Sequence, residues 1–228
     1  MQIAGFQKLT ALDFPNRVAA IVFTKGCNFR CPFCHNASLV THTEDAQEIS
    51  QQEILDYLEK RKGILDGVVV TGGEPLIQED IEDFLKSVKA LGYQIKLDTN
   101  GTNPDKLISL VNKGLVDYVA MDIKNCKEKY CETAGVKNVN LEKIQQSIDF
   151  LLCGLVEYEF RTTVVNELHT TQDIESIAKW ISGAEKYFLQ NFVDSGDVIC
   201  GTLSSVSTNQ LHQMCAVSTN FVKKCQIR

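Results

Sequence analysis

The sequence has neither an apolar run of membrane-spanning length nor a block of basic residues. A helix that crosses a bilayer needs about 18 or more apolar residues in succession, and no stretch of this chain approaches that length. The net charge is −6, which does not suit non-specific binding to nucleic acids or anionic membranes. Residues 1–13 also lack the charged-then-apolar layout of a signal peptide. We therefore expect a cytoplasmic protein with neither nucleic acid nor membrane as a partner.

Internal repeats, low-complexity tracts and linkers are absent as well. A length of 228 residues suits one large domain, and a hydrophobic fraction of 44% is enough for a sizeable core. We expect one domain over residues 1–228, with a core at about 18–192 and a C-terminal loop and helix at 193–228. His169 and His212 belong to no pattern and are expected at the surface.

Short runs rich in β-branched residues alternate with segments of helical periodicity along most of the chain. Strands are expected at 18–24, 67–71, 94–98, 118–122, 157–165 and 186–190, and helices at 50–62, 79–91, 104–113, 141–153 and 171–182. Such alternation favours βαβ units and a parallel sheet. Six units are fewer than the eight that close a barrel. The predicted fold is therefore α/β, with an incomplete, open, parallel TIM-like barrel.

Cysteine is abundant, with nine residues, and three of them are clustered. Clustered cysteines in a reducing compartment indicate metal or redox chemistry more than disulfides. Cys27, Cys31 and Cys34 form a C-x3-C-x2-C motif directly after the first expected strand, at the sheet edge where α/β proteins bind ligands. Three thiolates can hold three irons of a cubane cluster and leave the fourth iron open to a substrate. The other six are scattered, and we assign them no role: Cys126, Cys131, Cys153, Cys200, Cys215 and Cys225.

A zinc site is the alternative for the clustered cysteines. Zinc takes four nitrogen or sulfur ligands, and His35 could supply the fourth. His35 directly follows Cys34, however, and adjacent residues seldom both reach one metal ion.

Polar residues follow the next strands where each one ends. Two carboxylates, Asp98 and Asp122, arrive at neighbouring strand ends, and like charges so close need a cation or protons. The alternative is that these acids cap helices or pair with Lys96 and Lys124. Arg161 is the only charge in the latter half of its strand, so it needs a carboxylate partner, either one of the aspartates or a ligand.

The cysteine motif resembles the signature of the radical S-adenosylmethionine (SAM) superfamily, which places an aromatic residue before the last cysteine, here Phe33. The resemblance implies a [4Fe–4S] cluster whose free iron chelates SAM, and reductive cleavage of SAM to methionine and a 5′-deoxyadenosyl radical. It places Phe33 beside the adenine and the Gly72-Gly73-Glu74-Pro75 motif at the methionine end of SAM. Gln190, at the end of the last expected strand, could touch the adenine or ribose.

Within that superfamily the chain resembles the activases of glycyl radical enzymes. The resemblance lies in residues 5–16, in Cys34-His35-Asn36, in Asp98-Thr99-Asn100-Gly101 and in Asp122-Ile123-Lys124. The family usually has glycine where Asn16 stands, and asparagine tolerates a positive φ better than most residues. The expected SAM-binding set is Phe33, His35, Gly72, Gly73, Glu74, Pro75, Asn100, Asp122, Ile123, Lys124, Arg161 and Gln190. The resemblance also implies a monovalent cation on Asp98, Thr99 and Asp122.

The implied reaction is hydrogen abstraction from a glycine Cα of a partner enzyme in an anaerobic setting. Residues 5–16 resemble the start of anaerobic ribonucleoside-triphosphate reductase activating proteins. This resemblance implies that reductase as the partner, and a flavodoxin or ferredoxin is the expected electron donor. Two alternatives stay open. One is a small-molecule radical SAM enzyme such as a 7-carboxy-7-deazaguanine synthase. The other is a non-catalytic zinc- or cluster-binding redox module, in which the motifs at the strand ends would have no role.

Overall fold

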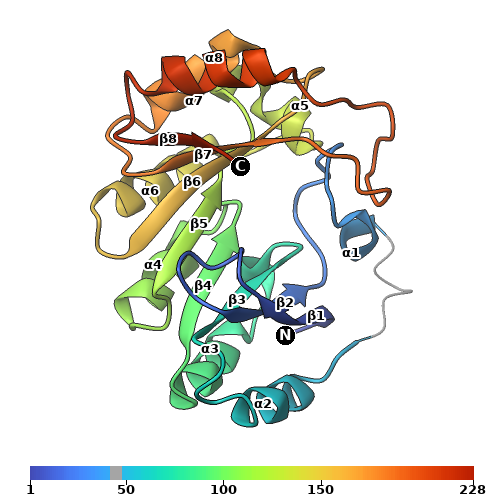
Figure 1. Ribbon diagram of the computed structural model, residues 1–228, viewed down its shortest axis with the longest axis vertical. Coiled ribbons are helices and arrows are strands. Elements are labelled where there is room, and N and C mark those ends of the chain that lie inside the picture. Colours follow the sequence, from blue (N-terminus) through green and yellow to red (C-terminus); the bar gives the residue numbers. More distant parts are fainter. Residues whose placement is uncertain (42–47) are drawn as a thin grey trace.

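The computed structural model describes residues 1–41 and 48–228, and its eight strands form one sheet in the order of the sequence (Figure 1). Strand β1 runs antiparallel to β2, and every later pair of neighbours is parallel. Strands β1 and β8 are the two edges of the sheet, so the predicted open parallel α/β fold is confirmed. The strands are β1 Ile3–Thr10, β2 Ala19–Thr24, β3 Gly67–Gly72, β4 Gln94–Thr99, β5 Tyr118–Asp122, β6 Glu157–Val164, β7 Tyr187–Asn191 and β8 Cys225–Ile227.

The six expected strands correspond to β2–β7, within one or two residues at each end. Both edge strands were missed. An edge strand is paired on one side only and need not be apolar, and β1 leaves much of its sequence, IAGFQKLT, partly or fully exposed. A loop and a helix were expected over residues 193–228, but after the helix the chain also forms β8, which pairs with β7.

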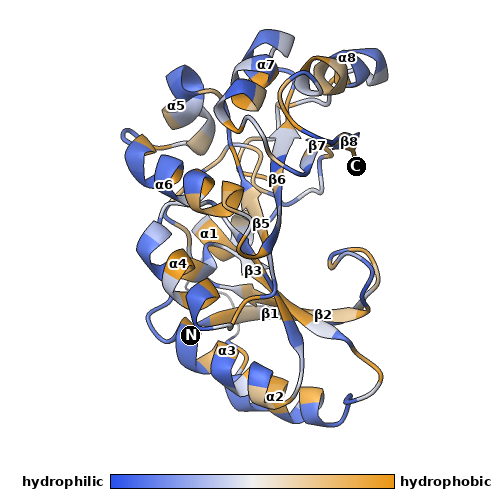
Figure 2. Cartoon of the chain, turned by 90° about the vertical axis from the view of Figure 1, so that its left-hand side faces the viewer, coloured by the Kyte–Doolittle hydropathy of each residue, from blue (hydrophilic) through white to orange (hydrophobic). Residues whose placement is uncertain are grey.

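The helices cover one face of the sheet, and Figure 2 shows their apolar residues turned towards it. Six of them, α2, α3, α4, α6, α7 and α8, were expected, whereas the short α1 and α5 were not. Among the described residues, none of the helices is both long and apolar enough to span a bilayer. The helices are α1 Ala37–Thr41, α2 Gln51–Glu59, α3 Ile81–Ala90, α4 Pro104–Asn112, α5 Tyr130–Ala134, α6 Leu141–Leu152, α7 Thr171–Trp180 and α8 Thr208–Ser218, with short 3-10 turns at Pro75–Ile77 and Lys127–Lys129.

The other face of the sheet lines the inside of the open barrel and carries charge. Successive side chains of a strand point to opposite faces, so Lys96 and Asp98 of β4 lie on the same face. Glu159 and Arg161 of β6 share a face for the same reason. Inward-facing charges in a barrel must pair with one another, and these pairs form the site described below.

Two local expectations had different outcomes. Asn16 has a φ of 59°, and it is the only non-glycine residue with positive φ in the described ranges, so the turn before β2 keeps its shape with asparagine. His169 was expected at the surface, but it is buried. Its ring accepts the Val165 N–H at 3.1 Å through Nδ1 and lies 2.8 Å from the Lys124 carbonyl through Nε2. His212 is exposed, as expected.

Candidate functional site

A cavity of about 540 Å³ lies at the carboxyl ends of the central strands, with the three clustered cysteines in its wall. The wall of the cavity is partly polar and partly apolar. Charged residues at the strand ends face aromatic side chains of residues 25–36, the loop that carries the three cysteines and is called the cysteine loop below. Of the expected site residues, the structure brings these to the wall: Cys27, Cys31, Phe33, Cys34, His35, Gly72, Gly73, Glu74, Asp98, Thr99, Asn100, Asp122, Lys124, Arg161 and Gln190.

Pro75 and Ile123, which were also expected to bind the cofactor, do not line this cavity. Pro75 is buried and begins the 3-10 turn after the glycine pair. Ile123 is buried in the core, where its N–H donates to the Arg161 carbonyl at 2.8 Å. Both therefore shape the backbone behind the wall.

The cysteine loop is held by close backbone approaches on two sides. The Gly73 N–H donates to the Thr24 carbonyl and the Glu74 N–H to the Gly26 carbonyl, each at 2.8 Å. A Cβ at Gly73 would lie 1.8 Å from the Gly26 oxygen, so only glycine fits there. On the other side Gly135, with a φ of 65°, brings helix α5 against Arg30, and a Cβ there would lie 1.9 Å from the Arg30 oxygen.

The environment of the thiols suits metal-bound thiolates more than free ones. Burial, assisted by the nearby Glu74 charge, raises the pKa of Cys27 to about 12, and burial raises that of Cys31 to about 11. Without metal both thiols are protonated, and a bound metal would displace those protons. The Phe29 N–H, 3.3 Å from the Cys27 sulfur, already points at the atom where a thiolate would form.

The three thiols fit a cluster better than a single ion. Within residues 1–41 and 48–228, no three His, Cys, Asp or Glu side chains are arranged to hold one metal ion. A cubane cluster has a different requirement, because each thiolate binds its own iron. Three cysteines on one loop facing a shared cavity meet that requirement.

Glu74 of the glycine motif is engaged within the protein. Its side chain is only 1% exposed, and its two oxygens accept the Leu76 N–H at 3.0 Å, the Thr99 hydroxyl at 2.7 Å and the Asn100 N–H at 2.7 Å. Burial raises the pKa of Glu74 to about 7 despite these bonds. The carboxylate therefore ties the end of β3 to the end of β4.

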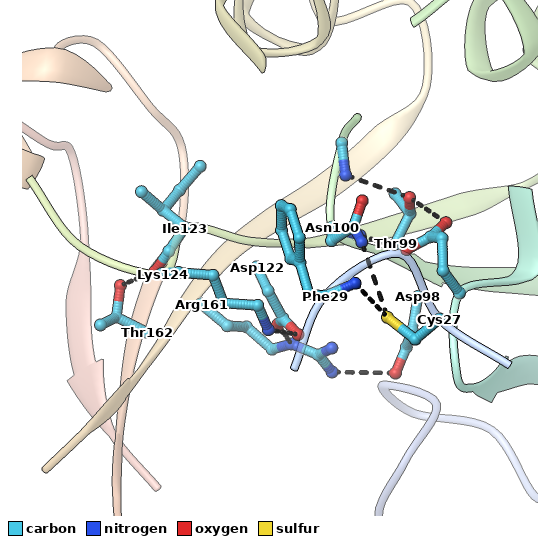
Figure 3. A network of polar contacts seen from close by, with 12 residues as sticks. Cys27, Phe29, Asp98, Thr99, Asn100, Asp122, Ile123, Lys124, Arg161 and Thr162 are labelled. Carbon is cyan, nitrogen blue, oxygen red and sulfur yellow. Dashed lines mark hydrogen bonds and ion pairs between the residues drawn. The ribbon is translucent and has the colours of Figure 1, made fainter. Parts of the chain in front are cut away.

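Arg161 joins the two strand-end aspartates (Figure 3). Its Nε donates to Asp122 at 2.8 Å and one terminal nitrogen donates to Asp98 at 3.0 Å. Lys96 reaches Asp98 at 2.6 Å, and Lys124 reaches Asp122 at 3.0 Å. The expectation that Arg161 pairs with an aspartate, and the alternative that the aspartates pair with Lys96 and Lys124, both describe what the structure shows.

The charges in this network outweigh the cost of burial. Burial alone would raise the pKa of Asp98, but the charges of Arg161 and Lys96 hold it below its usual value. Arg161 and Lys124 do the same for Asp122, whose pKa lies far below its usual range. Burial would lower the pKa of Lys124, and the Asp122 charge more than reverses that effect. Asp98, Asp122, Lys124 and Arg161 are therefore ionised at neutral pH.

Aromatic side chains stand on the cysteine side of the cavity. Phe33 is almost fully buried, so it offers the cavity little more than one edge or face of its ring. His35 packs edge-to-face on Phe192, with the ring centres 5.6 Å apart. The rings of Phe33 and His35 provide flat surfaces, and Gln190 at the end of β7 provides a polar group; a nucleoside needs both kinds of contact.

Sequence reasoning missed several residues of the site. Asp13, from the connection between β1 and β2, and Arg228 both line the cavity. Arg228 pairs with the buried Glu159 at 2.8 and 3.0 Å and lies over the Phe188 ring. Arg228 belongs to no motif, so only the folded chain brings it in, whereas Asp13 lies in the segment 5–16, whose residues were given no role at the site. Asn28 was overlooked within the cysteine motif itself, where it contacts Asn100 at 2.8 Å.

Comparison with known proteins agrees with this geometry. The sequence matches the family model of the Radical SAM superfamily over residues 21–190. A Methanocaldococcus jannaschii protein named as a candidate glycyl-radical enzyme activating enzyme is 32% identical over 235 residues, covering 99% of this chain and 95% of that protein. The pyruvate formate-lyase-activating enzyme of Listeria monocytogenes is 31% identical over 147 residues, covering 60% of this chain and 59% of that enzyme.

A solved structure shows the same fold. Streptococcus suis SuiB bound to S-adenosylmethionine superimposes with a TM-score of 0.66, covering 91% of this chain and 51% of SuiB at 13% identity. At that identity the likeness concerns the architecture of the open barrel.

Proposed function

The chain belongs to the radical SAM superfamily, and we propose that it cleaves SAM reductively and generates a glycyl radical on a partner enzyme. The observation that carries the proposal is the cavity in which Cys27, Cys31 and Cys34 face a charged strand edge. The near full-length similarity to a candidate glycyl-radical enzyme activating enzyme supports this branch of the superfamily. We propose anaerobic ribonucleoside-triphosphate reductase as the partner, on the motif in residues 5–16.

In this proposal Cys27, Cys31 and Cys34 hold a [4Fe–4S] cluster. When bound there, the cluster supplies the electron that splits SAM into methionine and a 5′-deoxyadenosyl radical. The protein's own contribution is to hold the cluster, to orient SAM and to admit the glycine loop, and no side chain is needed as an acid or base.

Lys124 is the residue best placed to take the SAM carboxylate. Its ammonium uses one donor on Asp122, so two of its three donors are left for a ligand. Gly72 and Gly73 present backbone without side chains at the same wall. We assign the methionine end of SAM to this side, and the adenosine end to Phe33, His35 and Gln190.

Asp98, Asp122, Glu74, Asn100 and Arg161 serve as positioning residues in this proposal. Their side chains bond mainly to one another and to the backbone, so they fix the wall. Pro75 and Ile123 act one layer further out. We further propose that residues 1–228 act as one radical SAM domain, since one sheet runs from β1 to β8.

The open barrel gives a protein substrate room to enter. Strands β1 and β8 are the edges of one sheet, so the cavity between them is not sealed by paired strands. A glycine-bearing loop needs such an entrance, and a flavodoxin or ferredoxin would approach the cysteine loop from outside.

The test is electron paramagnetic resonance of candidate partners mixed with reconstituted, reduced protein and SAM under anaerobic conditions. We expect a glycyl radical signal on anaerobic ribonucleotide reductase, together with 5′-deoxyadenosine. Deoxyadenosine without a radical on any glycyl radical enzyme would leave a radical SAM enzyme but contradict the activase proposal. Absence of SAM cleavage by protein with a complete cluster would contradict both.

A further inference from the structure

The site does not fit the monovalent cation that the family resemblance implies. Such an ion would need oxygen atoms of Asp98, Thr99 and Asp122 directed at one point. The Thr99 hydroxyl instead donates to Glu74 at 2.7 Å and accepts the Gly101 N–H at 3.1 Å. The Thr99 hydroxyl is thus used in the hydrogen bond to Glu74 that joins the ends of β3 and β4.

All four carboxylate oxygens of the two aspartates already have a cationic partner. Asp98 accepts from Lys96 on one oxygen and from Arg161 on the other, at 2.6 and 3.0 Å. Asp122 accepts from Arg161 and Lys124 in the same way, at 2.8 and 3.0 Å. Two carboxylates are therefore shared among three cationic side chains.

The charge balance also opposes a further cation. The two aspartates and their three cationic partners sum to a charge of +1, counted without the neighbouring Glu74, and within this set Lys96 is 2% and Arg161 13% exposed. Another cation would raise that charge at short range and low dielectric, which costs free energy. One more anion, such as the carboxylate of SAM, would neutralise it.

Lys96 differs from the other two cations in its position. Lys124 and Arg161 lie in the cavity wall, whereas Lys96 does not. Lys96 lies two residues before Asp98 on β4, so both side chains point into the barrel. Its ammonium bonds one oxygen of Asp98, while Arg161 bonds the other oxygen and also bonds Asp122.

We propose that the Lys96 ammonium is a built-in counter-cation, and that this chain binds and cleaves SAM without a monovalent metal ion. The proposal rests on the proposed function and refines it. Lys96 is a positioning residue that acts through Asp98, and it takes the charge role that the family resemblance gives to an ion.

Two measurements test this inference in KCl, in NaCl and in tetramethylammonium chloride at one ionic strength. The first is the melting temperature of the cofactor-free protein, and the second is deoxyadenosine formation by the reconstituted protein. The wild type should give the same values in all three salts. If it melted earlier or cleaved SAM more slowly without K⁺ or Na⁺, the inference would be wrong and the proposed function would stand.

Lys96→Met tests the residue itself. We expect its melting temperature to fall by about 5 °C or more in tetramethylammonium, and SAM cleavage to fall by about tenfold or more, with recovery in K⁺ or Na⁺. Lys96→Arg should behave as the wild type. Lys113→Met removes an exposed ion pair with Glu82 and should show no dependence on the cation.

The outcomes separate the two proposals. Lys96→Met with unchanged activity and melting temperature in every salt, or with a loss that neither K⁺ nor Na⁺ reverses, would overturn the role of Lys96. Wild-type protein that cleaves SAM in none of the salts would contradict the proposed function, while its melting temperatures would still decide whether it binds a cation.

Discussion

The side-chain amide of Asn100 donates a hydrogen bond to Asn28 over 2.8 Å and so joins the end of β4 to the cysteine loop. Thr102 completes a ring, because its hydroxyl donates to Asn100 at 2.7 Å and accepts from Asn28 at 2.9 Å. The ring fixes the orientation of the Asn100 amide, which also lies 4.0 Å from the Cys27 sulfur (Figure 3).

Asn28→Ala should lower the reduction potential of the cluster. Hydrogen bonds to the sulfur ligands are one determinant of cluster potential, and this variant frees the Asn100 amide to turn away from Cys27. A redox titration followed by electron paramagnetic resonance would measure the shift. Asn138→Ala, at an exposed position, should leave the potential unchanged, and equal potentials in the two variants would refute the argument.

Cys27→Ala, Cys31→Ala and Cys34→Ala should each abolish SAM cleavage. Each removes the ligand of one iron, so iron content and visible absorbance after reconstitution should fall as well. Cys153→Ala is the matched control, because Cys153 is exposed and bonds only to the Asp149 carbonyl. Deoxyadenosine formation by any of the three variants would contradict the assignment of the cluster.

Gly135→Ala should hinder cluster assembly. A left-handed backbone costs a non-glycine residue about 1–2 kcal/mol, and here the new Cβ would also meet the Arg30 oxygen in the cysteine loop. Gly154→Ala should have only the backbone cost. The φ of Gly154 is 70°, and no atom of the described residues outside its chain neighbours lies within 4 Å of its Cβ position. Thermal unfolding and iron content should show a larger loss for Gly135→Ala, and equal losses would argue against support of the loop by α5.

Glu74→Gln should destabilise the protein by about 1–3 kcal/mol. In the variant the amide nitrogen of glutamine would face an N–H group that now donates to a carboxylate oxygen of Glu74. The site is too buried for a water molecule to take that hydrogen bond. Urea unfolding of the cofactor-free protein measures the change, with Glu79→Gln at an exposed position as the control. A loss no greater than that of Glu79→Gln would mean that the bond between β3 and β4 contributes little.

The contribution of His169 to stability should fall below about pH 6.5, whereas that of Glu74, whose pKa burial raises to about 7, changes in the opposite direction. Burial lowers the pKa of His169 from its usual value of 6.5, although its contacts with the Lys124 and Val165 backbone oppose this. As the pH falls through 6.5 the unfolded chain binds the proton first, so the folded state loses free energy relative to it. His169→Gln should therefore raise the unfolding free energy at pH 5.5 relative to its value at pH 7.5, compared with the wild type, and His212→Gln should not. Parallel slopes for the wild type and His169→Gln would contradict this.

The central strands could be predicted from the sequence because their role requires a particular composition. Strands such as β3, with its Val68–Val70 run, are buried on both faces, and such strands read as continuous apolar segments. The cysteine motif could also be recognised from the sequence, because its three cysteines lie within eight consecutive residues of one loop. Strand β8 has only three residues and draws its stability from β7, so nothing local marks it.

The pairing of charges could be predicted only in part. Lys96 and Lys124 were recognised as alternative partners of the aspartates, but the sequence cannot state which oxygen each one reaches. His169 shows the same limit, because its hydrogen bonds go to backbone groups of Val165 and Lys124 and backbone groups carry no sequence signal. Arg228 meets Glu159 across 69 positions of the chain, a distance that no motif spans.

Two backbone hydrogen bonds, from Gly73 to Thr24 and from Glu74 to Gly26, join the Gly72-Gly73-Glu74-Pro75 motif to the start of the cysteine loop. Because these bonds couple the two segments, binding of a cluster to the cysteine loop should also restrict the motion of the Gly72-Gly73-Glu74-Pro75 motif. Amide hydrogens of Gly73 and Glu74 should consequently exchange with solvent more slowly once the cysteines are loaded, before any SAM is present. Assembly of the cluster would then also order the backbone that we propose binds SAM, before SAM arrives.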